Sequence, residues 1–243
     1  MGIMPGAETA ATPLAKGEEP ILRAVGIKRV FGKGSAAVHA LKGANLTIPH
    51  GRLVALKGRS GSGKTTLINL LGALDMPTEG DIFFLGQEIT KLSEKRRNQI
   101  RRTQMGFIFQ SYALVPLMSA YENVEFGLRI AGVPAKHRKE MAESALESVG
   151  LKARMKHRPF EMSGGEQQRT AIARAIAHRP KLLLADEPTA ELDSKMGLQI
   201  IKIFKDLVQK EGMTIVLTTH DPAIMEIVDQ VFALEDGQIV DQN

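Results

Sequence analysis

The stretch that most constrains this chain lies at residues 53–66 and joins an apolar run to a glycine-rich turn. Residues 53–56 predict a short buried strand, and residues 58–65 fit the pattern G-x-x-x-x-G-K-[ST]. Three glycines within residues 58–63 allow consecutive N–H groups to converge on one anion. The apolar spacing of residues 67–71 predicts a helix whose N-terminus would face the same anion. The sequence therefore predicts a nucleotide-phosphate site rather than an ordinary glycine-rich turn.

Two side chains of this loop have the chemistry that a bound nucleotide requires. Lys64 would reach the β- and γ-phosphates, and the Thr65 hydroxyl would ligate Mg²⁺. The residues expected to contact the nucleotide here are Gly58, Arg59, Ser60, Gly61, Ser62, Gly63, Lys64, Thr65 and Thr66.

Composition limits the classes to which the chain can belong. Its hydrophobic content of 43% and charged content of 24% are typical of a soluble globular protein. No apolar run approaches the roughly 18–20 residues that cross a bilayer, and the absence of cysteine excludes disulfides and thiolate metal sites. A net charge of +5 permits, but does not require, contact with nucleic acid or an anionic membrane. The densest basic run, residues 91–102, predicts a solvated helix face, with a partner or lipid-headgroup surface as the alternative.

The rest of the chain divides into segments of different character. Residues 1–20 predict a disordered leader, and residues 21–48 predict two or three antiparallel strands. Phe31 would end the first strand, either as a rim or core aromatic or as a ring that stacks on a base. Residues 80–86 and 105–110 predict two more strands. We expect residues 111–160 to be mostly helical and about 111–170 to form an inserted helical subdomain.

A second glycine-containing motif begins a helix at Ser163. Ser163 and Glu166 have the spacing of a capping box. That box does not explain Gly164 and Gly165, which leave bare N–H groups at the positive end of the helix dipole. We therefore expect a second element that faces phosphate.

Two further strands are expected to end in reactive side chains. Residues 181–185 predict a buried strand followed by Asp186 and Glu187, and residues 214–219 predict a strand followed by His220. Parallel α/β sheets bind ligands at the carboxyl edge. Asp186 would hold Mg²⁺, Glu187 would orient or deprotonate the attacking water, and His220 could bond a γ-phosphate oxygen. The other five histidines are expected at the surface.

These motifs, in this order, resemble those of the nucleotide-binding domain of ABC transporters. The matching elements are residues 58–65, Gln110, residues 163–167, Asp186-Glu187, Leu192-Asp193 and His220. The resemblance covers residues 21–240. It implies an α/β fold of the P-loop NTPase type, in which a RecA-like core bears an antiparallel β subdomain and the helical subdomain. The domain would then occupy residues 21–243.

The resemblance also implies roles for particular residues. Phe31 would stack on adenine, Gln110 would touch Mg²⁺ and sense a permease, and His220 would contact the γ-phosphate. Family members form head-to-tail dimers that hold two ATP molecules between them. Ser163, Gly164, Gly165 and Glu166 would thus bind nucleotide held by the other protomer, and Asp193 would couple the two sites.

Finer features resemble one subfamily, which includes the macrolide-export, lipoprotein-release and cell-division ATPases. The resembling segments are residues 72–80, 106–112 and 158–166, whereas Arg59 and Ala190-Glu191 depart from the usual pattern. We expect an ATPase that uses ATP and Mg²⁺, forms a homodimer or heterodimer, and drives a separate transmembrane permease from the cytoplasmic face of the membrane. Two alternatives are an ATP-gated scaffold and a nucleic-acid-associated ATPase of the same superfamily. No nucleic-acid partner is expected, because the chain has neither a coiled-coil insert nor cysteine-rich zinc modules.

Overall fold

The computed structural model describes residues 19–242, so the predicted leader lies almost entirely outside the described residues. Two sheets and seven α-helices make up the described part. The helices are α1 Lys64–Leu71, α2 Glu94–Gln104, α3 Ala120–Ala131, α4 Ala135–Ser148, α5 Gly164–Ile176, α6 Ser194–Glu211 and α7 Pro222–Met225. None of the helices in residues 19–242 has the length and apolar character needed to cross a lipid bilayer.

The larger sheet forms the centre of the molecule. Its strands, in spatial order, are β10 Gln238–Gln242, β9 Gln230–Glu235, β3 Leu53–Lys57, β8 Thr214–Thr219, β7 Leu182–Ala185 and β6 Met105–Ile108. All neighbouring pairs from β9 to β6 are parallel, and β10 is antiparallel to β9. The carboxyl ends of β3, β8, β7 and β6 consequently lie at one edge.

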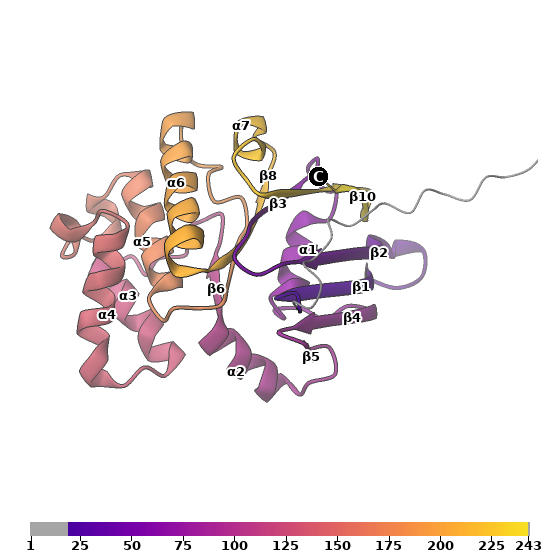
Figure 1. The fold of residues 1–243 in the computed structure, drawn as a ribbon, viewed down its shortest axis with the longest axis horizontal. Helices are drawn as coiled ribbons and strands as arrows, with labels where there is room; N and C mark the ends of the chain where they lie inside the picture. Colours follow the sequence, from indigo (N-terminus) through magenta and orange to yellow (C-terminus); the bar gives the residue numbers. More distant parts are fainter. Residues whose placement is uncertain (1–18, 243) are drawn as a thin grey trace, which may run out of the picture.

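Both faces of this sheet are covered, which explains why its strands are continuous apolar runs. Successive residues of β3 alternate between two hydrophobic cores: Leu53 and Ala55 pack in one, and Val54 and Leu56 in the other. The first core is completed by helices α3 to α6, and the second by α1 and the smaller sheet. Figure 1 shows the helices α3–α6 on one side of the central strands and the smaller sheet on the other.

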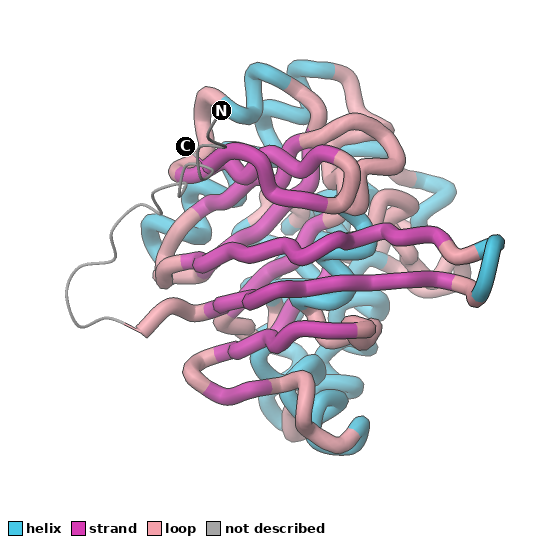
Figure 2. The backbone as a smooth tube through the Cα atoms, turned by 90° about the vertical axis from the view of Figure 1, so that its right-hand side faces the viewer, coloured by secondary structure: helices cyan, strands magenta, loops and turns pink. Residues whose placement is uncertain are grey.

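The smaller sheet is antiparallel and has the order β2 Val38–Ile48, β1 Leu22–Phe31, β4 Glu79–Phe84 and β5 Gln87–Glu88. Residues 21–48 thus contain two strands, within the predicted range of two or three. Figure 2 shows these strands running across the face of the molecule opposite the helices. The sheet meets the core beside the phosphate loop, where the Gly237 carbonyl accepts from the Lys42 N–H (2.8 Å) and the Gly237 N–H donates to the Ser62 carbonyl (3.1 Å).

The helical region differs in one respect from the prediction. Residues 111–119 form a loop, because Tyr112 and Ala113 have positive φ angles and Ser119 begins α3 with a complete capping box to Glu122. The Ser-x-x-Glu spacing at residues 119–122 was the available sequence signal for this start. Gly150, which has φ +76°, follows the end of α4 in the left-handed conformation that glycine adopts easily.

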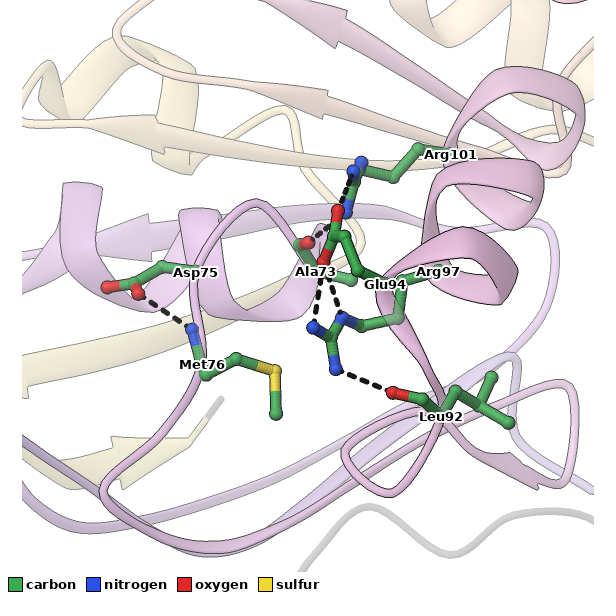
Figure 3. Close-up of polar contacts among 7 residues, drawn as sticks. All are labelled: Ala73, Asp75, Met76, Leu92, Glu94, Arg97 and Arg101. Atoms are coloured by element: carbon green, nitrogen blue, oxygen red, sulfur yellow. Dashed lines mark hydrogen bonds and ion pairs between the residues drawn. The ribbon is translucent and has the colours of Figure 1, made fainter.

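The basic run in α2 is only partly a solvated face. Arg97 and Arg101 turn towards Glu94 and are largely buried, with side-chain exposures of 13% and 17%. Arg101 also donates to the Ala73 carbonyl at the end of α1, and Arg97 donates to the Leu92 carbonyl (Figure 3). The prediction of a solvated face was therefore wrong for these two side chains, because the carboxylate and the two carbonyls satisfy their donors. The contacts fix α2, and the start of β6 after it, against the phosphate-loop helix.

His178 also departs from the predicted surface position. The His178 ring is partly buried at the end of α5, and its Nε2 lies 3.0 Å from the Met105 carbonyl oxygen. Because the carbonyl can only accept, the neutral ring donates from Nε2. Burial lowers the pKa of His178, and this hydrogen bond only partly opposes that effect.

Candidate functional site

The phosphate loop lies between β3 and α1, at the carboxyl edge of the central sheet. Gly63 begins α1 with φ +105°, and a Cβ placed there would lie 2.6 Å from the Ala40 carbonyl oxygen. A side chain at this position would clash with backbone as well as strain the loop, so glycine is required for two reasons. The loop therefore presents backbone, not side chains, where α1 begins.

Lys64 is the charged group at the centre of this loop. Its side chain is buried, and its Nζ donates to the carbonyl oxygens of Gly58 (2.8 Å) and Arg59 (3.1 Å). Within residues 19–242, no carboxylate forms an ion pair with Lys64 at 4.0 Å or less. A buried ammonium group ordinarily requires a negatively charged partner. The neighbouring Ser62 Oγ is also buried and has no hydrogen-bond partner among the described residues. Both groups fit an anionic ligand that supplies phosphate oxygens.

Asp186 and Glu187 follow β7 and are held by a residue that the sequence reasoning missed. The Thr218 hydroxyl, fully buried on β8, donates to Asp186 Oδ1 (2.7 Å) and accepts from the Glu187 N–H (2.7 Å). Glu187 has φ +44°, an uncommon conformation for a non-glycine residue that functional sites often hold under strain. The only sequence signal for this role was that Thr218 and Thr219 end β8 just before His220. No periodicity distinguishes Thr218 from Thr219.

His220 lies beside Glu187 at the same edge. Its Nδ1 is 3.9 Å from Glu187 Oε1, and 73% of its side chain is exposed. A cleft of about 380 Å³ is lined by these two residues together with Thr218 and Asp193. Asp193 itself caps α6 by accepting from the Met196 N–H (2.9 Å). The structure therefore brings the predicted base, the histidine and the loop before α6 to one cleft.

The predicted cap at Ser163 is confirmed. Ser163 Oγ accepts from the Glu166 N–H (3.3 Å), and Glu166 Oε2 accepts from the Ser163 N–H (2.9 Å). The latter bond is the main reason that the pKa of Glu166 is lowered, and Arg154 adds an ion pair at 3.0 Å. Glu166 is thus engaged within its own cap and with Arg154.

The two glycine motifs lie on different helices that cover opposite faces of the central sheet. Apolar residues of α1 pack in the core beside the smaller sheet, whereas those of α5 pack in the core formed with α3, α4 and α6. In Figure 1 the label α1 lies near the smaller sheet and α5 lies among the helices on the other side. Gln110 follows β6, next to β7 and Asp186, so it shares the edge with the phosphate loop.

Phe31 lies in the smaller sheet, at the end of β1. Its side chain is 42% exposed, so the core alternative for this residue is wrong. The Arg29 guanidinium lies over the ring, 4.5 Å from its centroid, and also pairs with Asp75 at 2.9 Å. One face of the ring is therefore covered by a cation.

Comparison with known proteins gives a consistent result. Residues 41–190 match the ABC transporter family. The chain is 43% identical to the macrolide export ATP-binding/permease protein MacB of Wolinella succinogenes over 91% of this chain and 34% of that protein. It thus spans about a third of that relative's length. It is 40% identical to the lipoprotein-releasing system ATP-binding protein LolD of Hyphomonas neptunium over 92% of this chain and 98% of that protein.

A solved structure agrees with these relatives. The ATP-binding cassette MJ0796, in a dimeric post-hydrolysis state bound to ADP and Pi, superposes with a TM-score of 0.84 at 36% identity, covering 91% of this chain and 97% of that one. The expected P-loop NTPase fold, with its antiparallel β and helical parts, is confirmed. The chain belongs to the ABC transporter family, as an ATP-binding protein and ATPase of the group that includes MacB and LolD.

Proposed function

We propose that this chain is an ATPase subunit that dimerises on ATP and drives a separate transmembrane permease, of the mechanotransmission or export type. The observation that most supports dimerisation is the position of the two glycine motifs on helices of opposite faces. A head-to-tail dimer would set Ser163, Gly164 and Gly165 of one protomer against nucleotide on the other's phosphate loop. The MJ0796 cassette is dimeric in its post-hydrolysis state, which supports a dimer for this chain.

At the nucleotide, the phosphate loop would act by positioning and neutralising charge. Residues 58–66 would surround the phosphates with backbone N–H groups, and Lys64 would exchange its two carbonyl contacts for phosphate oxygens. Glu187 would orient or deprotonate the attacking water, and His220 would hold the γ-phosphate or that water from the other side of the cleft. Phe31 would stack on adenine with its uncovered face.

The residues proposed for Mg²⁺ have the donor chemistry that this ion prefers. Thr65 and Gln110 are exposed, and Asp186 is half-buried with Oδ1 held by Thr218, so all three supply oxygen donors at the same sheet edge. When bound, Mg²⁺ would neutralise negative charge that develops on the phosphates. Asp186 would hold it directly or through water.

The proposal of a separate permease is supported by the two relatives together. MacB joins an ATP-binding part to a permease in one protein, and LolD is an ATP-binding protein of nearly this chain's length. In the loop after β6, the side chains of Phe109 and Leu117 are 40% and 80% exposed. We propose that this loop and the helical subdomain, residues about 111–170, receive the permease at the cytoplasmic face of the membrane, with Gln110 and Asp193 coupling its movement to the two ATP sites.

The first test is the Glu187→Gln variant, which keeps the shape of the side chain but removes its charge. It should bind ATP, accumulate as a dimer with ATP in size-exclusion chromatography with light scattering, and hydrolyse ATP at least about 100-fold more slowly. Lys64→Ala is the matched control and should remain monomeric with ATP. A Glu187→Gln protein that binds ATP but stays monomeric would contradict dimerisation on ATP. Normal turnover by this variant would contradict the assignment of Glu187 as the residue that orients or deprotonates water.

The permease requires its own test. The chain should co-purify from detergent-solubilised native membranes with a transmembrane protein that raises its ATPase activity. Activity that instead follows added DNA or RNA, with a steep dependence on salt, would favour the nucleic-acid alternative and refute the permease proposal.

A further inference from the structure

Tyr112 lies where three of the nucleotide-site elements meet. It belongs to the loop after Gln110, and its hydroxyl would be 3.2 Å from a Cβ placed at Gly164, the first residue of α5. The Leu192 side chain approaches the same point to 3.8 Å. The pKa of Tyr112 is raised first by burial and next by the negative charge of Glu191, in the loop before α6. A single side chain therefore links the glutamine loop, the N-terminus of α5 and the loop before α6.

The backbone of this loop is held in an uncommon conformation. Tyr112 has φ +50° and Ala113 has φ +51°, both in the left-handed region that non-glycine residues rarely adopt. Such residues persist where surrounding contacts over-determine their geometry. The contact here comes from α5: Arg174 donates to the Tyr112 carbonyl at 2.9 Å and to the Ala113 carbonyl.

Arg174 is suited to hold the loop firmly. It lies mostly buried between α5 and α3, where its side chain lies against Gly127, and burial lowers the pKa of its guanidinium. No carboxylate in residues 19–242 forms an ion pair with it within 4.0 Å, so the two carbonyl oxygens are the acceptors that compensate its burial. Removing the loop from α5 would leave this cation without those acceptors, so the bonded arrangement is strongly favoured.

We propose that Tyr112 and Arg174 are positioning residues that hold the glutamine loop against α5 and beside Glu191, so that the three elements change position as one unit during ATP hydrolysis. A displacement of Gln110 then either moves the N-terminus of α5 and residues 190–193 with it or breaks these bonds. Glu191, which departs from the usual residue of the family, is the negative charge that acts on Tyr112. The proposal concerns hydrolysis by the chain itself and does not depend on a permease.

The test uses two variants that remove only the hydroxyl of Tyr112 and only the charge of Glu191. Tyr112→Phe and Glu191→Gln should each lower kcat about tenfold while KM for ATP stays within about twofold, because the phosphate loop is unchanged. The kcat of the double variant should fall no further than that of the more affected single variant, because both substitutions remove the same interaction. Tyr121→Phe is the matched control, since it removes the chain's other tyrosine hydroxyl and should leave kcat unchanged.

A second measurement does not depend on turnover. Amide hydrogen exchange should become faster at residues 163–166 and 190–193 in Tyr112→Phe, although neither segment is altered, and not in Tyr121→Phe. Arg174→Ala should also make amide exchange faster in these two segments, and it should lower the stability of the protein. Arg174→Lys should restore part of the protection from exchange, because lysine can donate to one of the two carbonyls. The proposal is overturned if Tyr112→Phe matches Tyr121→Phe in exchange, or if the losses of Tyr112→Phe and Glu191→Gln multiply in the double variant.

Discussion

Thr218→Val replaces the hydroxyl beneath the catalytic edge with a methyl group of the same shape. The hydroxyl makes two short bonds, to the Asp186 carboxylate and from the Glu187 N–H, both at 2.7 Å. A lost bond to a charged group costs about 1.5–3 kcal/mol, and an unsatisfied N–H costs about 1–3 kcal/mol. Asp186 and Glu187 are only half-buried, so water recovers part of both terms. We expect the free energy of unfolding to fall by about 2–4 kcal/mol.

The same substitution should affect catalysis more than binding. The bond that the Glu187 N–H donates to Thr218 fixes the backbone of Glu187 at φ +44°, and without it the carboxylate loses its position in the cleft. We expect kcat to fall by about 10- to 100-fold, because small displacements of a catalytic group have effects of this size. The assays are urea denaturation and steady-state ATPase measurements on the purified chain.

A matched control lies at the other end of the same strand. Thr214 is also fully buried on β8, and its hydroxyl accepts from the Gly51 N–H at 2.9 Å, far from the catalytic edge. Thr214→Val should cost about 1–3 kcal/mol of stability and leave kcat unchanged. The reasoning is refuted if Thr218→Val is no less stable than Thr214→Val or retains the turnover of the unaltered chain.

Three further predictions concern Lys64, Phe31 and His178. Lys64→Ala should lose most ATP affinity, measured with a fluorescent ATP analogue, because no other buried cation lies in residues 58–66; unchanged affinity would contradict the phosphate-loop assignment. Phe31→Ala should weaken ATP binding by about 1–3 kcal/mol, as expected for a base that stacks on an aromatic ring, whereas Phe31→Tyr should not. Because burial lowers the pKa of His178, the unfolded chain takes up a proton at higher pH than the native one, so the free energy of unfolding should fall as pH drops below about 6.5. His178→Asn, compared by urea denaturation at about pH 7.5 and 5.5, should reduce this dependence, and an undiminished dependence would assign it to other groups.

Much of this protein was determined by local sequence. The continuous apolar runs of β3 and β7, the spacing of Ser163 and Glu166, and the glycines of residues 58–63 each specify a local structure through sterics, capping or burial. Because parallel strands end at one edge, the chain order of Lys64, Asp186 and His220 was enough to predict that they share it. These inferences needed only neighbours within a few residues.

Only the tertiary structure decided the contacts between distant segments. Thr218 lies 32 residues from Asp186, and Arg174 lies 62 residues from Tyr112, and neither pairing leaves a periodic signal in the chain. The burial of Arg97 and Arg101 likewise depended on where Glu94 and the Ala73 carbonyl came to lie. Hydrophobic patterns fix which face of an element is buried, but the polar partners that a buried group finds depend on how the packed elements meet.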